Sequence, residues 1–199
     1  MIYHYDIQQG TDEWHEIKKG KMSASHAQAI GNNGKGLDTY IYQLATELFS
    51  QAERDNYTNK DMERGNELEP IARQLYEKVN NVKVIQVGFV EMNKYAGCSP
   101  DGLVGEDGLL EIKCPNDVNY FKFLIGESKT DPGWEWQIQM QLLITERKWC
   151  DLLYYNPNFK GKEGKIKRIF PDQEKQEKLI TGLKAGEEKL KDLINKYND

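Results

Sequence analysis

The spacing of apolar residues changes along the chain and predicts where helices and strands lie. A period of about 3.6 residues indicates helices in seven segments. These are two short helices within 11–31 and longer ones over about 38–50, 60–80, 116–126, 132–146 and 172–196. Thr11 and Ser23 are suited to cap the two short helices, residues 31–36 and 51–59 favour loops, and Pro70 predicts a kink or a restart.

Strands are predicted where β-branched and aromatic residues replace the helical period. These segments are 82–90, 95–99, 109–114, 150–155 and 165–170, with a turn over 156–164. Because helices precede, separate and follow these strands, the order predicts a single mixed α/β domain over residues 1–199.

Composition and charge restrict the class of protein. The 199 residues are 38% hydrophobic and 11% aromatic, which is enough for the core of one domain. The net charge of −5 disfavours a protein that coats nucleic acid with a basic surface. A nuclease remains compatible with it, because a metal site is rich in carboxylates and the metal supplies local positive charge.

Cysteine use and the N-terminus bear on the compartment. The three cysteines, Cys98, Cys114 and Cys150, form no C-x-x-C motif and cannot all pair, which is typical of a reducing compartment. No apolar run approaches the roughly 18 residues of a membrane helix, and the first residues lack the pattern of a signal peptide. We therefore expect a cytoplasmic protein without a membrane segment.

Candidate chemistry is concentrated in Ser-Pro-Asp-Gly at 99–102 and Leu-Glu-Ile-Lys at 110–113. The proline and glycine around Asp101 place it at a turn. Glu111 and Lys113 are two residues apart on a strand, so they share one face, while Ile112 points into a core. Adjacent carboxylates repel unless a cation bridges them, and Mg²⁺ prefers such oxygen ligands.

These groups fit metal-assisted hydrolysis of a phosphodiester. Asp101, Glu111 and the backbone carbonyl of Ile112 are candidate metal ligands, and the metal would activate water and stabilise charge on phosphate. Lys113 could orient the water or stabilise the developing charge. E-x-K alone is common on surface strands as a salt-bridge pair, but the Pro-Asp-Gly turn ten residues upstream favours the site.

Two helices carry further polar candidates. Glu69 lies in the helix predicted over 60–80, and Gln137 and Gln141 lie four residues apart in that over 132–146. Without a function, Glu69 would be a solvent-exposed helix residue, and the glutamines would form a half-buried seam beside aliphatic residues. Either glutamine could instead bind the nucleophilic water or a phosphate.

The sequence resembles the bacteriophage lambda exonuclease or YqaJ-type viral recombinase family of PD-(D/E)XK nucleases. The resemblance extends over nearly the whole chain. Its motifs are Gly10-Thr11-Asp12-Glu13-Trp14, Arg64-Gly65 with Glu69-Pro70, Ser99-Pro100-Asp101-Gly102, Leu110-Glu111-Ile112-Lys113, Gln137-Ile138-Gln139 and Tyr155-Asn156-Pro157. It implies a restriction-endonuclease-like core, in which helices flank a small central mixed sheet.

The resemblance also implies an activity: a Mg²⁺-dependent 5′-to-3′ exonuclease that digests one strand of duplex DNA and leaves a 3′ overhang for a single-strand annealing protein. It implies two Mg²⁺ ions, which Mn²⁺ could replace, and a ring-shaped homotrimer encoded by a phage or prophage. The implied catalytic set adds Glu69, as a ligand of the second metal, and Gln137, near the nucleophile, to Asp101, Glu111 and Lys113.

A pocket for the 5′-phosphate is implied at Lys18, Ser25 and Ser99. Lys18 occupies a position where arginine is usual in the family, so the bidentate contact that an arginine makes with phosphate would be replaced by that of a single ammonium charge. The alternatives are an endonuclease of the same superfamily, a catalytically silent DNA-binding relative, and an iron–sulfur nuclease, which would need four cluster cysteines.

Overall fold

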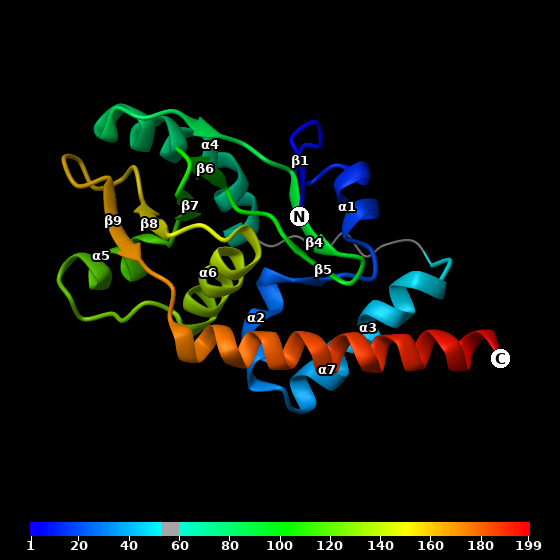
Figure 1. The fold of residues 1–199 in the computed structure, drawn as a ribbon. Coiled ribbons are helices and arrows are strands. Elements are labelled where there is room, and N and C mark those ends of the chain that lie inside the picture. The colour runs from blue at the N-terminus through cyan, green and yellow to red at the C-terminus, as the bar shows by residue number, and fades with distance from the viewer. Residues whose placement is uncertain (53–59) are drawn as a thin grey trace.

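The computed structural model describes residues 1–52 and 60–199 as a mixed α/β fold, in which helices flank two mixed sheets (Figure 1). The predicted fold class is confirmed. The helices are α1 (Asp12–Lys18), η1 (Ala24–His26), α2 (Ala27–Asn32), α3 (Lys35–Phe49), α4 (Lys60–Asn80), α5 (Asp117–Leu124), α6 (Pro132–Thr145) and α7 (Gln173–Asn198). The strands are β1 (Ile2–His4), β2 (Met22–Ser23), β3 (Val84–Ile85), β4 (Phe89–Asn93), β5 (Ala96–Cys98), β6 (Gly102–Val104), β7 (Gly108–Lys113), β8 (Trp149–Tyr155) and β9 (Gly164–Ile169).

The strands form a four-stranded sheet, β1-β4-β5-β2, and a five-stranded sheet, β3-β6-β7-β8-β9. In the larger sheet β7 and β8 are parallel, and the other neighbours are antiparallel. The middle strand of this sheet is β7, which carries Glu111 and Lys113. The chain leaves the smaller sheet at β5 and enters the larger one at β6, so the turn at Asp101 joins the two.

The larger sheet separates two hydrophobic clusters. Leu109 belongs to the main cluster, which includes residues of α2, α3, α6 and α7. Leu110 and Ile112 belong to a smaller cluster that includes Ala72 and Tyr76 of α4. Alternation along β7 therefore sends successive side chains to opposite faces, and Ile112 is buried as expected.

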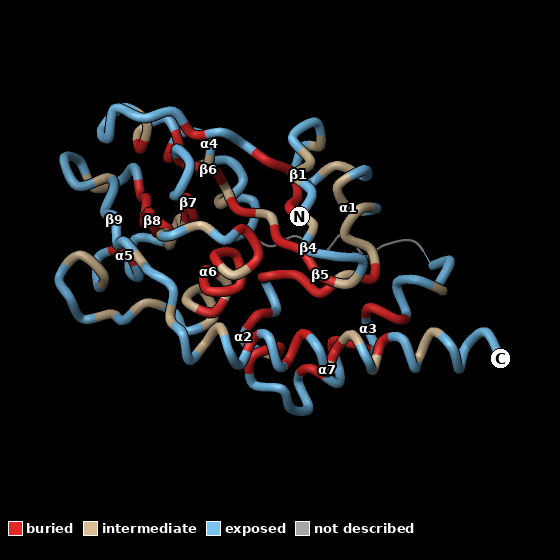
Figure 2. The backbone as a smooth tube through the Cα atoms, viewed as in Figure 1, coloured by how far each residue is buried: buried red, intermediate tan, exposed pale blue. Residues whose placement is uncertain are grey.

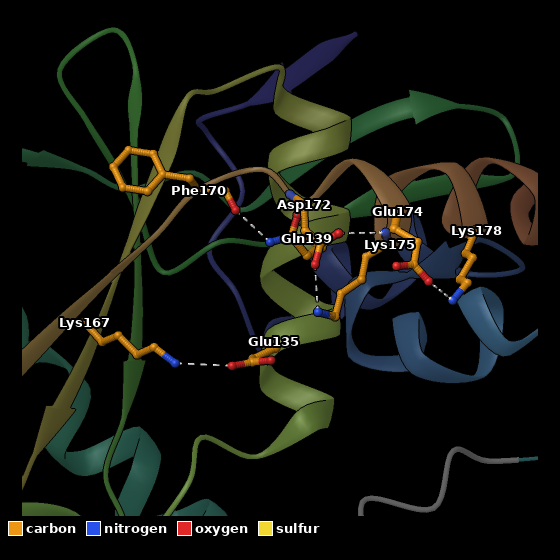
Figure 3. Close-up of polar contacts among 8 residues, drawn as sticks. All are labelled: Glu135, Gln139, Lys167, Phe170, Asp172, Glu174, Lys175 and Lys178. Atoms are coloured by element: carbon orange, nitrogen blue, oxygen red, sulfur yellow. Dashed lines mark hydrogen bonds and ion pairs between the residues drawn. The ribbon is translucent and has the colours of Figure 1, made fainter.

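Polar contacts attach α6 to the segment between β9 and α7 (Figure 3). The Gln139 side chain donates to the Phe170 carbonyl at 2.9 Å and accepts from the Asp172 N–H at 2.8 Å. Asp172 in turn caps α7 by accepting from the Lys175 N–H. Lys167 of β9 lies 3.2 Å from Glu135. These contacts fix one side of α6 and leave Gln137 on a different side.

The long helix α7 packs against α2 and α3 (Figure 1). Its buried residues recur along one side, which faces the body of the molecule (Figure 2). Gly182 lies against the backbone of Ile30, so close that a Cβ atom there would be 1.9 Å from the Ile30 carbonyl oxygen. Among the described residues, none of the helices has the length and apolar character needed to cross a membrane.

Several local predictions differ from the structure. The short strands β1, β2 and β6 are not predicted, because two or three residues carry too little alternation. Thr11 caps α1 as predicted, but Ser23 makes no side-chain cap and instead bonds Ser25. Within the predicted loop at 31–36, α2 ends at Asn32 and α3 already begins at Lys35.

Two further predictions concern α4 and the segment before it. A single helix includes Pro70, so the helix does not restart there. Residues 53–59 of the predicted loop over 51–59 lie outside the described residues.

Candidate active site

Strand β7 brings a carboxylate and an ammonium group together in a largely buried position. The Glu111 side chain has 2% relative exposure, and Lys113 Nζ donates to Glu111 Oε1 at 2.7 Å. Because the two residues are separated by one position on the strand, the backbone itself holds them on the same face.

Asp101 approaches this pair from the turn between β5 and β6. Its Oδ2 accepts a hydrogen bond from the backbone N–H of Ile112 at 2.6 Å. The bond ties the turn directly to β7, beside Glu111. Asp101 therefore reaches the same site although it comes from a different part of the sheet.

Helix α6 supplies two amides to Glu111. Gln137 Nε2 donates to Glu111 Oε1 at 2.7 Å, and Gln141 Nε2 donates to Oε2 at 2.8 Å. Lys113 Nζ also donates to Gln137 Oε1 at 3.2 Å. Gln137 and Gln141 thus fix both oxygens of one buried carboxylate, whereas Gln139 points to the β9–α7 segment instead (Figure 3).

Glu69 enters the site from α4 and is ion-paired with Arg73 one turn later on the same helix. The Glu69 side chain is 34% exposed, whereas that of Arg73 is 10% exposed. Arg73 thus holds Glu69 from the buried side, and Glu69 lines the cleft together with Glu111.

All nine predicted site residues line one cleft of about 820 Å³. These are Lys18, Ser25, Glu69, Ser99, Asp101, Glu111, Ile112, Lys113 and Gln137. They come from α1, η1, α4, α6, β7 and the turn before β6. The structure therefore brings together residues that the sequence separates by more than half of its length.

Of the three residues predicted to bind a 5′-phosphate, Lys18 and Ser99 contact Trp14. The indole N–H of Trp14 donates to Ser99 Oγ at 2.9 Å, and the Lys18 ammonium lies 3.5 Å from the centre of the Trp14 ring. Ser25 Oγ lies 2.9 Å from Ser23 Oγ. A cation and hydroxyls on one wall of the cleft make a suitable environment for an anion.

Burial and mutual repulsion change the acidity of the carboxyl groups. Burial raises the pKa of Asp101 well above its usual range, and the nearby Glu111 and Glu69 raise it further. Burial likewise raises the pKa of Glu69, against the opposing effect of Arg73. Burial lowers the pKa of Lys113, but Glu111 and Asp101 outweigh this and the net pKa is raised. Such a site is stabilised by additional positive charge.

The donor set fits a hard divalent cation with few protein ligands. No group of three or more His, Cys, Asp or Glu residues in ranges 1–52 and 60–199 is preassembled around a metal position. Glu69 turns to Arg73, and Glu111 accepts from Lys113 and two glutamines. Asp101, Glu111 and Ile112 line the same cleft, and Mg²⁺ is commonly bound by one or two carboxylates together with waters.

Sequence reasoning did not assign a role to several residues of this site. Gln141 was considered together with Gln137 as a partner of water or phosphate, but its hydrogen bond to Glu111 was not predicted. Arg73 was not included, although it lies four residues after Glu69 on the same helix face. Trp14 and Trp134 also line the cleft. Trp134 lies three residues before Gln137 on α6, so helical spacing already places the two on one face, whereas the position of Trp14 follows only from the fold.

Comparison with known proteins identifies the family. Residues 13–148 match the YqaJ-like viral recombinase domain. The chain belongs to this family. The predicted resemblance is therefore confirmed. A protein of Acanthamoeba polyphaga mimivirus, "Uncharacterized protein R354", is 32% identical over 111 residues. That match covers 48% of this chain and only 20% of the mimivirus protein, so the chain spans a small part of that relative.

Solved structures of exonucleases share the fold over almost the full length. The alkaline exonuclease LHK-Exo of Laribacter hongkongensis is 30% identical, with a TM-score of 0.84 over 94% of this chain and 96% of that one. Its structure in complex with dAMP matches with a TM-score of 0.83. A phage-related exonuclease of Haemophilus somnus 129PT is 16% identical with a TM-score of 0.70, which concerns the fold alone. Family and structure together support a phage-type exonuclease.

Proposed function

We propose that this YqaJ-family chain is a Mg²⁺-dependent exonuclease that digests the 5′-phosphorylated strand of linear duplex DNA and leaves a 3′ overhang. The observation that carries the proposal is the convergence of Asp101, Glu111, Lys113, Glu69 and Gln137 in one cleft. The match to an alkaline exonuclease over 94% of the chain supports the reaction class.

The carboxylates are the proposed metal ligands. Asp101, Glu111 and the Ile112 carbonyl would hold one Mg²⁺, and Glu69 would help to hold a second after turning from Arg73. When bound, the ions would activate water, neutralise phosphate charge and stabilise the leaving oxygen, and Mn²⁺ is expected to substitute. Gln137 and Gln141 fix the orientation of Glu111 toward this position through their hydrogen bonds.

Lys113 and Gln137 contribute the remaining polar groups. The Lys113 ammonium lies beside Glu111, where it can stabilise negative charge that develops on the phosphate. The Gln137 side chain can hydrogen-bond the attacking water if it exchanges its contact with Lys113. Both groups are pre-positioned by the strand and the helix that carry them.

Recognition of the DNA end is assigned to the other wall of the cleft. Lys18, Ser25 and Ser99 would bind the 5′-phosphate, with Trp14 holding Ser99 and Lys18 in place. The dAMP bound to LHK-Exo supports a cleft that accepts a nucleoside monophosphate.

The biological setting is part of the proposal. The overhang would serve a single-strand annealing protein in phage-type recombination, and the enzyme would act in the bacterial cytoplasm as a phage or prophage product. A homotrimeric ring around DNA would explain processive digestion by a chain whose net charge is −5.

A time course on end-labelled duplexes tests the proposal. The substrates carry 5′-phosphate or 5′-hydroxyl ends, and the reactions contain Mg²⁺ or Ca²⁺. We expect mononucleotides to be released from the 5′-phosphorylated strand with Mg²⁺, slower release from 5′-hydroxyl ends, and little with Ca²⁺. Asp101→Ala should abolish release while DNA binding persists.

Other outcomes would redirect the assignment. Cutting of closed circles at rates comparable to linear DNA would indicate an endonuclease, and binding without cleavage under all metals would indicate a silent relative. Equal activity of Asp101→Ala and the parent would show that the chemistry lies elsewhere.

A further inference from the structure

An aromatic wall, formed by Phe123, Trp134 and Tyr154, lines the cleft beside the catalytic groups. Phe123 comes from α5, Trp134 from the first turn of α6 and Tyr154 from β8. The wall adjoins the active site directly, because Lys113 Nζ lies 5.6 Å from the centre of the Trp134 ring. The reaction roles proposed above do not require these rings.

The three rings contact one another in different geometries. Phe123 stacks on Tyr154, with centroids 3.7 Å apart and planes 19° apart, and the Lys165 ammonium lies 5.0 Å from the Phe123 centroid. Trp134 contacts Tyr154 in a tilted arrangement, at 5.9 Å and 60°. Phe123 and Tyr154 therefore support each other by stacking, and Trp134 packs against Tyr154 and lines the cleft.

Helix α6 contains a second tryptophan that makes the contrast clear. Trp136 is 9% exposed and packs so tightly against Gly31 that a Cβ atom there would lie 2.4 Å from its ring. Trp134, two residues earlier, is only half-buried and lines the cleft. Trp136 belongs to the main hydrophobic cluster, whereas Trp134 packs against the edge of that cluster and keeps part of its ring exposed in the cleft.

We propose that Trp134 stacks on the base of a nucleotide that flanks the scissile phosphate; this inference rests on the proposed function. The proposed nuclease must separate the strand that it digests from the complementary strand, and the unpaired base then needs a new stacking partner. Every base has a π-face, so an indole accepts all four, as a nuclease without sequence preference requires. Lys113 is placed to contact the adjoining phosphate.

The charge around the wall suits a polynucleotide. Lys165 lies over Phe123, and Lys129 lines the same cleft. These cations can attract the backbone phosphates while the rings hold the base. The wall would therefore keep the cut strand separated from its complement near the metal ligands.

A double-mutant cycle between protein and DNA tests the stacking. The variants are Trp134→Ala and Trp134→Phe, and Phe121→Ala is the matched control because Phe121 is 52% exposed on α5 and does not line the cleft. The 5′-phosphorylated duplexes carry a tetrahydrofuran abasic residue at the first, the second or a distant internal nucleotide. The value of kcat/KM with Mg²⁺ is measured for each pair.

We expect Trp134→Ala to lose about 10-fold or more on normal DNA, since stacking on one base contributes on this order. The abasic residue at one of the two terminal positions should cost the parent a similar factor and cost Trp134→Ala almost nothing further. Trp134→Phe should retain most of the parent's preference, and Phe121→Ala should behave like the parent.

The inference would be overturned if, at both terminal positions, the abasic residue lowered kcat/KM by the same factor in Trp134→Ala as in the parent. The exonuclease assignment would remain intact. If the parent fails to digest the normal duplex, the proposed function fails instead. The same variants and DNAs are then compared by fluorescence anisotropy in Ca²⁺, where equal affinity of the parent for normal and abasic ends would overturn the stacking itself.

Discussion

At the scale of single residues, the site is organised around one carboxylate. Glu111 is almost fully buried and accepts hydrogen bonds from Lys113, Gln137 and Gln141. An unpaired charge in such a position would be costly, and these donors offset that cost. Among the residues that the structure describes, Asp101 has no comparable set of side-chain donors, and Glu111 and Glu69 repel its negative charge.

This imbalance predicts that Asp101→Asn stabilises the protein in EDTA. The raised pKa of Asp101 means that the folded state binds a proton more tightly than the unfolded state. The free energy of unfolding therefore falls as pH rises above the usual aspartate range. Asparagine removes this penalty, so Tm should rise by about 2–4 °C for each 1 kcal/mol relieved, and more at pH 8 than at pH 5.

Thermal unfolding at the two pH values measures the effect. Asp107→Asn is the control, because Asp107 is an exposed partner of Lys148 and should give no pH-dependent gain. A lower Tm for Asp101→Asn at pH 8 would contradict the electrostatic argument.

The same residues predict the pH dependence of hydrolysis. The pKa values of Asp101 and Glu69 are raised, so both, as proposed metal ligands, would lose metal-binding capacity at a higher pH than ordinary carboxylates. The pKa of Lys113 is raised as well, so it keeps its charge through the alkaline range. Activity should rise with pH out of the acidic range and continue into the alkaline range without an early decline. A pH–rate profile at saturating Mg²⁺ that falls steadily above neutrality would refute this.

At the scale of elements, α6 connects the site to the rest of the fold. One side of it holds Glu111 through Gln137 and Gln141, and another side is fixed to the β9–α7 segment through Gln139 (Figure 3). The segment leads into α7, which packs on α2 and α3. The position of Glu111, the proposed catalytic carboxylate, is thus linked to helix packing outside the cleft.

The closest of these helix contacts predicts a large effect at Gly182. A Cβ atom would meet the Ile30 carbonyl oxygen at 1.9 Å, so Gly182→Ala must separate α7 from α2. We expect a loss of about 3 kcal/mol or more in the free energy of unfolding. Gly65→Ala is the matched control, because nothing lies within 4 Å and alanine favours the α4 helix by about 1 kcal/mol. Urea unfolding distinguishes the two, and a neutral Gly182→Ala would mean that the helices are not in this contact.

At the scale of the whole molecule, the net negative charge must be compatible with binding DNA. The chain carries 32 acidic and 27 basic residues, so overall charge does not attract DNA. The cleft nevertheless carries Lys18, Lys113 and Lys129. A negative exterior with local cations favours an enzyme that holds DNA by enclosure rather than by a broad basic surface.

We propose that this enclosure is the homotrimeric ring that the family resemblance implies. Size-exclusion chromatography with light scattering should give three times the 23.1 kDa mass of the chain. A challenge with unlabelled DNA after the reaction starts should then leave digestion of the first duplex largely unaffected. A monomer that dissociates after each cleavage would contradict the ring.

The sequence alone determined the local features. The alternation of Glu111 and Lys113 with Leu110 and Ile112 defined the face of β7, since the strand period depends only on backbone geometry. Most helices followed from long apolar periods in the same way. The family was also evident from ordered motifs, because each motif is continuous in the chain.

Only the tertiary structure decided how these parts meet. The division of the strands into two sheets, the contact of Gln141 with Glu111, the pairing of Glu69 with Arg73 and the placement of Trp134 beside Lys113 all depend on packing between distant segments. Periodicity identifies which face of a helix is buried, but not what the face meets. That partner is selected by the combined packing of the whole chain, which no local pattern encodes.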